Sequence, residues 1–213
     1  MKFFRTEKYY VKQRSRFYGV CFPLLVLVGL LFLNPSTSFS QDYGLNFLGN
    51  ETVKDKRTKL DLNHDGYYSF HNEFELSFRM RLRPGPRLSF GYVVRIIDTK
   101  GHNIDIIYNG PKSSSLQVVY GQELTNISLP DNTPEIFDNW TDIRLKIDLK
   151  NGTLQFNASD TTMVFSGIDF EGKVKILFGA NDFASFKTIE VPAMNIKDIR
   201  ILEKGKLKHH YQM

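Results

Sequence analysis

The stretch Phe74-Glu75-Leu76-Ser77-Phe78-Arg79-Met80-Arg81-Leu82 alternates apolar and polar side chains at every position. This alternation indicates a β-strand that turns one face toward a hydrophobic core and the other toward water. The same pattern recurs in residues 88–96, 143–149 and 174–178. In the second of these, Leu88, Phe90, Tyr92, Val94 and Ile96 form the apolar set. One-sided strands of this kind are typical of antiparallel sheets.

Turn residues separate the alternating segments. They are Pro84-Gly85-Pro86, Lys100-Gly101, Asn109-Gly110-Pro111 and Asn151-Gly152. Asn-Gly favours a short hairpin, because both residues tolerate positive φ. The spacing predicts about ten to twelve short strands, as in a sandwich. No segment after Gln41 has a sustained helical stripe, so the sequence predicts an all-β, antiparallel, two-sheet sandwich.

Residues 1–40 have the three parts of a signal peptide. A basic start precedes the apolar stretch Val20–Leu33, and Ser38-Phe39-Ser40 supplies small residues for cleavage before Gln41. An uncleaved anchor helix is the alternative. We favour cleavage, because fourteen residues rise only about 21 Å against a hydrocarbon core of about 30 Å. The sequence therefore predicts a signal helix followed by a secreted, periplasmic or cell-surface domain.

The net charge of +5 belongs entirely to this leader, which holds six cationic residues and one anionic residue. Residues 41–213 are therefore neutral overall, which argues against a nucleic-acid partner and against a membrane partner for the mature domain. The single cysteine, Cys21, lies in the apolar stretch. Since secreted animal domains often carry disulfides, a mature chain without cysteine points to bacterial export.

The order of features from Tyr43 to about Leu202 resembles the laminin G-like domain of the concanavalin A-like lectin and glucanase superfamily. The features that carry the resemblance are Leu45-Asn46-Phe47-Leu48-Gly49, Phe74–Phe78, Trp140 with the strand after it, the hairpin at Asn151-Gly152, and Met194–Ile201. The resemblance implies a jelly-roll sandwich over residues 41–203. It is similar to domains in large exported proteins of Gram-negative bacteria, sometimes ahead of a Kelch-type propeller.

The resemblance leaves two functions open. The first is a non-catalytic binding or spacer module with a glycan or protein ligand, and the second is a glycan-active enzyme such as a glucanase or lyase. Glucanases of the superfamily carry Glu-Ile-Asp-Ile-x-x-Glu, whereas this chain has Asn103-Ile104-Asp105-Ile106-Ile107-Tyr108-Asn109. Because Asn can neither attack as a carboxylate nor shuttle a proton, we expect a domain that is not an enzyme.

One segment matches the first half of a calcium loop. Asp61, Asn63 and Asp65 stand at the oxygen-ligand positions, and Gly66 occupies the turn position. The twelfth position holds Asn72 in place of glutamate, and an ordinary Asx-rich turn is the alternative. Calcium is the one cofactor that the sequence suggests.

Aromatic residues supply the other candidate site. Tyr92, Tyr108 and Tyr120 are the candidate glycan-stacking residues, since pyranose faces stack on aromatic rings. In related domains the tryptophan before an alternating strand serves in packing, so we expect Trp140 to be buried in the core. Residues 204–213 are basic and lack alternation, which predicts a linker or tail. This segment either bridges to a further domain of a larger protein or ends the chain.

Overall fold

The computed structural model describes residues 44–49, 56–64, 66–83, 90–110, 115–130, 139–183 and 187–213. They belong to a compact unit that spans Tyr43–Met213. The predicted signal peptide, its cleavage site and the Pro84-Gly85-Pro86 turn lie outside the described residues. Among the described residues, no helix has the length and apolar character needed to span a membrane.

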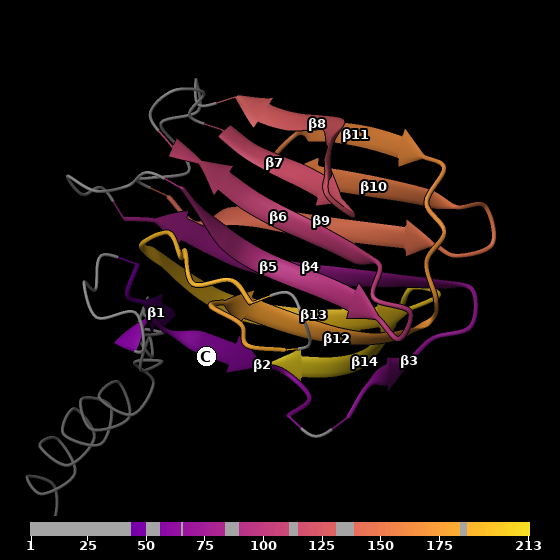
Figure 1. Ribbon diagram of the computed structural model, residues 1–213, viewed down its shortest axis with the longest axis horizontal. Coiled ribbons are helices and arrows are strands. Elements are labelled where there is room, and N and C mark those ends of the chain that lie inside the picture. The colour runs from indigo at the N-terminus through magenta and orange to yellow at the C-terminus, as the bar shows by residue number, and fades with distance from the viewer. Residues whose placement is uncertain are drawn as a thin grey trace, which may run out of the picture. The chain divides into compact units, whose positions relative to one another are not determined.

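The unit is an antiparallel sandwich of two seven-stranded sheets, which confirms the predicted fold class (Figure 1). Sheet A has the order β1 (Leu45–Phe47), β13 (Met194–Glu203), β4 (Glu73–Leu82), β9 (Thr141–Asp148), β10 (Thr153–Ala158) and β11 (Thr161–Ser166), and β14 (Lys206–Tyr211) also pairs with β13. Sheet B has the order β2 (Lys59–Asp61), β12 (Lys173–Gly179), β5 (Phe90–Asp98), β6 (Asn103–Asn109), β7 (Ser115–Tyr120) and β8 (Glu123–Pro130), and β3 (Tyr68–Ser69) also pairs with β12.

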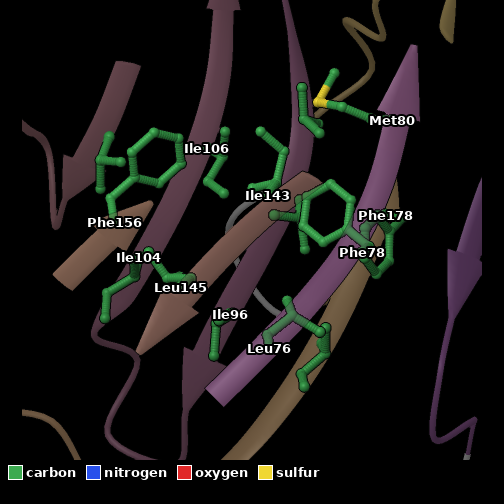
Figure 2. Close-up of a cluster of buried hydrophobic side chains, with 14 of the residues drawn as sticks. Leu76, Phe78, Met80, Ile96, Ile104, Ile106, Ile143, Leu145, Phe156 and Phe178 are labelled. Carbon is green, nitrogen blue, oxygen red and sulfur yellow. The ribbon is translucent and has the colours of Figure 1, made fainter. Parts of the chain in front are cut away.

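The alternation in residues 74–82 is confirmed by β4, whose apolar side chains are all buried. These side chains meet those of β5, β6 and β12 between the sheets, as Figure 2 shows for part of the core. Phe78 of sheet A and Phe178 of sheet B pack edge to face with ring centroids 5.1 Å apart. Such aromatic pairs stabilise a core beyond the burial of their area. The core therefore holds the two sheets together at their centres.

The Asn151-Gly152 signal does mark a hairpin, between β9 and β10. Its loop contains four residues, 149–152, and the Asp148 carboxylate accepts hydrogen bonds from the backbone N–H groups of Lys150 (3.0 Å) and Asn151 (2.9 Å). Gly152 has φ of +60°, a conformation that costs glycine little. The aspartate thus shapes a turn that Asn-Gly alone would have made shorter.

The prediction of a linker or tail at residues 204–213 is wrong for Lys206–Tyr211. Lys206–Tyr211 forms β14, which pairs with β13 across a tight turn at Lys204-Gly205, where both residues have positive φ. The hydroxyl groups of Tyr211 and Tyr68 are hydrogen-bonded at 2.5 Å. The first four residues of β14 are exposed, so the strand has no alternation for a sequence pattern to detect.

The β13–β14 hairpin should weaken in acid because of Glu203. Its carboxylate binds Lys208 Nζ at 2.9 Å and the backbone N–H of His71 at 3.0 Å, and these contacts lower the pKa of Glu203 from 4.5 to about 2. A lowered folded-state pKa stabilises the fold above the unfolded-state value, and this stabilisation disappears as the pH falls through the folded-state value.

We therefore expect the melting-temperature difference between the wild type and Glu203→Gln to be constant above about pH 5 and to shrink between pH 4.5 and about 2. Thermal melts across this range measure the difference. The exposed Glu123 of β8 supplies the control Glu123→Gln. A Glu203→Gln difference that does not vary with pH would contradict the expectation.

Trp140 is not a core residue, which corrects the expectation from sequence. Thr141, the first residue of β9, points into the core, so alternation directs Trp140 to the outer face of sheet A. Its ring is partly buried, with Lys197 Nζ 4.1 Å and the Arg81 guanidinium 5.1 Å from the ring centroid. Two cations over one indole make a cation–π arrangement.

Candidate glycan-binding groove

A groove on the outer face of sheet B is the strongest candidate site. It is a cavity of about 400 Å³ over strands β5 to β8. We call it the β5–β8 groove and define it by six lining residues: Phe90, Tyr92, Arg95, Asp105, Asn109 and Gln117. A cavity of similar volume on the outer face of sheet A, about 410 Å³, is lined mainly by charged and small polar residues, with Phe78 as the aromatic residue among the described ones that line it.

A β-bulge in β5 creates the groove. The register of β5 against β6 shifts between Tyr92 and Val94, so that Val93 and Val94 are both buried in the core. A bulge places two residues of one strand opposite one residue of its partner. Tyr92 and Arg95 can therefore both lie on the outer face although they are three positions apart. The alternation predicted Tyr92 and Val94 on the same face, and this is wrong because of the bulge.

A buried ion pair forms the floor of the groove. Arg95 donates from Nε to Asp105 Oδ1 and from Nη2 to Asp105 Oδ2, each at 2.7 Å. Both residues are buried, with 5% of Arg95 and 1% of Asp105 exposed. Asn103 Nδ2 also donates to Asp105 Oδ2, at 2.9 Å. Bidentate pairs of this kind fix geometry as well as charge.

The protonation of the pair follows from its surroundings. Burial raises the pKa of Asp105, and the hydrogen bonds from Arg95 and Asn103 oppose this rise. Burial alone would lower the pKa of Arg95, but the hydrogen bond and charge of Asp105 outweigh it and raise that pKa. Because the guanidinium stays charged and binds both carboxylate oxygens, the pair is ionic and its two charges cancel.

Aromatic and amide groups form the walls. The Tyr92 ring lies 5.1 Å from the Arg95 guanidinium and packs edge to face with Phe90 at 5.5 Å. Burial, followed by the charge of Asp105, raises the pKa of Tyr92, so its phenol is protonated and can donate. Asn109 Nδ2 donates to Gln117 Oε1 at 3.2 Å. The groove thus combines aromatic surface with planar hydrogen-bonding groups.

The structure does not bring the three predicted tyrosines together. Tyr92 lines the groove, whereas Tyr108 is 3% exposed and belongs to the core. Tyr120 packs against the core, and its hydroxyl donates to the backbone oxygen of Asp169 at 2.8 Å. The alternation of β6 explains the difference, because Tyr108 points inward while Asp105, Ile107 and Asn109 line the groove.

The predicted calcium loop contains a cation of the protein's own. Lys175 Nζ donates to Asp61 Oδ2 at 2.6 Å and to the backbone oxygens of Asn63 at 3.2 Å and His64 at 3.0 Å. Asp65 lies outside the described residues. Within the described ranges, no three His, Cys, Asp or Glu side chains form a metal-binding group. Calcium binding at this loop stays a prediction, and the lysine ammonium lies against two of the residues assigned to it, Asp61 and Asn63.

Comparisons with known proteins identify the type of sandwich. No family model matches the chain, and no curated protein matches its sequence. A heptameric SAP-like pentraxin from Limulus polyphemus is similar in structure, with a TM-score of 0.54, 11% identity, and coverage of 77% of this chain and 76% of the pentraxin. The fold is a jelly roll. An alginate lyase from Pseudomonas aeruginosa has a TM-score of 0.50 and 12% identity, with coverage of 70% of this chain and 74% of the lyase.

The lyase corrects the expectation that the domain is not an enzyme. That expectation rested on the missing glutamates at Asn103 and Asn109, which exclude glucanase chemistry alone. An alginate lyase shares the jelly-roll fold of this domain, so the missing glutamates do not exclude glycan-active enzymes of other kinds. Both similar structures agree with a jelly-roll sandwich, and no family model or curated relative identifies a laminin G domain.

Proposed function

We propose that this domain recognises a glycan through the β5–β8 groove. The observation that carries the proposal is the exposed side of the Tyr92 and Phe90 pair beside the planar groups of Asn109, Gln117 and the Arg95–Asp105 pair. A sugar ring presents C–H groups on its faces and hydroxyl groups at its rim. Aromatic rings contact the faces, and amides, carboxylates and guanidinium groups bind the hydroxyls in fixed directions. Small-molecule sites commonly combine such features.

A glycan-active enzyme is the form of this function that the alginate lyase neighbour supports. Elimination from a uronate needs donors that stabilise charge on the carboxylate, a base that removes the proton from the carbon beside it, and an acid that protonates the departing oxygen. The Asn109 and Gln117 amides can serve as donors. The protonated Tyr92 phenol can protonate the departing oxygen, and the exposed carboxylate of Glu190, whose charge also acts on Tyr92, can take the proton that the sugar loses. Alginate is therefore one polymer to test, beside a neutral β-glucan.

Two finer assignments complete the proposal. We propose the laminin G-like branch of the fold, on the order of motifs from Leu45 to Ile201. We also propose export guided by residues 1–40, which would bring the groove into contact with polysaccharides outside the cell.

We expect Tyr92→Ala to weaken binding of the recognised polymer about tenfold or more, the size of one buried aromatic contact. Titration calorimetry with alginate and with β-glucan measures binding, and the release of new chain ends measures cleavage. The control is Val164→Ala, since Val164 is 51% exposed on β11 of sheet A. Equal affinity of the wild type and Tyr92→Ala for both polymers would contradict the proposal.

A further inference from the structure

A second cavity, of about 780 Å³, lies at the β2–β12 edge of sheet B. We call it the β2–β12 pocket and define it by Asp61, Tyr67, Lys175, Asn181 and Phe183, which line it. Tyr67 and Phe183 pack edge to face with ring centroids 6.2 Å apart. Both rings are partly exposed, so they present aromatic surface to a ligand.

An acceptor in the wall of this pocket has no partner among the described residues. Asn181 is 5% exposed, and its Nδ2 donates to Thr188 Oγ1 at 2.5 Å. Its Oδ1 is buried and accepts no hydrogen bond within the described part of the chain. A buried acceptor without a partner costs free energy, which a ligand hydroxyl would recover only if the Asn181 side chain turned its oxygen toward the pocket.

Lys175 organises the pocket. Its ammonium binds Asp61 and the backbone oxygens of Asn63 and His64, and it lies 5.1 Å from the centroid of the Phe183 ring. One side chain of β12 thus connects the turn after β2 to the aromatic wall. The pair Lys59–Asp182, at 2.8 Å, balances the other charges of the lining. The pocket is therefore preformed, and its lysines and aspartates are paired.

The pocket and the β5–β8 groove share one face of sheet B. Leu177 of the pocket is the cross-strand partner of Arg95, and Arg95 is the partner of Asp105 in the groove. In the strand order β2-β12-β5-β6-β7-β8, three strand spacings, about 14 Å, separate β6 in the groove from β2 at the pocket. A chain of several sugar residues is needed to cover such a length.

From this geometry we propose that the β2–β12 pocket is a second subsite for the glycan, and that it holds a sugar ring distant from the one at Tyr92. The inference rests on the proposed function. The sugar ring contacts Tyr67 and Phe183. The ligand class is thus an extended oligosaccharide, and its affinity depends on its length.

The test compares a disaccharide with a hexasaccharide, each prepared from β-glucan and from alginate. We expect Phe183→Ala to weaken hexasaccharide binding about tenfold and to leave disaccharide binding at the groove unchanged. Phe183→Tyr retains the ring and should retain the affinity. Circular dichroism and thermal melts verify that each variant is folded.

A matched groove variant separates the two proposals. If Tyr92→Ala weakens both ligands while Phe183→Ala changes neither, the second subsite is overturned and the proposed function remains. If Tyr92→Ala changes neither ligand, or if the wild type binds none of the four, the proposed function fails and the subsite fails with it. Loss of hexasaccharide affinity alone in Phe183→Ala, together with loss of both in Tyr92→Ala, supports both proposals.

Discussion

Asp105→Ala should lower the free energy of unfolding by about 3–5 kcal/mol, because it leaves the guanidinium of Arg95 buried without its carboxylate partner. The two side chains are joined by hydrogen bonds of 2.7 Å and are almost fully covered. An uncompensated charge in such a place has lost its hydration, and the contact with the Tyr92 ring does not replace the carboxylate. Urea unfolding, followed by circular dichroism, measures the change.

Two further variants make this expectation specific. Arg95→Met combined with Asp105→Leu removes both charges and should recover most of the lost stability, since apolar replacements of buried pairs are often neutral. Lys146→Ala breaks the more exposed Glu73–Lys146 pair of sheet A and should cost about 1 kcal/mol or less. A double variant as unstable as Asp105→Ala would show that the cost does not come from the unpaired charge.

Phe178→Ala should cost about 3–5 kcal/mol through the lost burial and the cavity that remains. Phe178 is fully buried in β12, which lies between β2 and β5, and its ring packs against Phe78 of the opposite sheet. The substitution therefore weakens the packing between the two sheets. Val164→Ala, at an exposed position, should stay within about 0.5 kcal/mol. A cost below about 1 kcal/mol for Phe178→Ala would show that this contact does not join the sheets.

The sandwich can be predicted from the sequence because the alternation of apolar and polar residues in each strand is a local pattern. The alternation in β4 and β9 follows directly from residues whose neighbours two positions away share a face. β14 escapes this reasoning because its side chains are mostly exposed, and its stability comes from pairing with β13. The outward direction of Trp140 could not be predicted, because the face to which a residue just before a strand points depends on where the strand begins.

The site is less predictable than the fold for a similar reason. Tyr92 could be proposed as an aromatic candidate, but its outward direction depends on the bulge at Val93, which leaves no signal in the alternation. Arg95 and Asp105 become a pair only when β5 and β6 align in register. Asn181, Tyr67 and Lys175 are brought together by contacts between distant segments, and no motif connects them in sequence.

The pairing of β1 with β13 has a consequence for how the chain folds. Phe47 lies opposite Met194, and Phe74 of β4 lies opposite Glu203, so neighbours in sheet A come from segments more than a hundred residues apart. Closing loops of this length lowers the entropy of the chain before the stabilising contacts form. Proteins dominated by such pairings therefore fold in milliseconds to seconds. Until β13 has joined, the long strand β4 has one open edge. The domain is therefore most prone to aggregation in the interval before β13 pairs with β4.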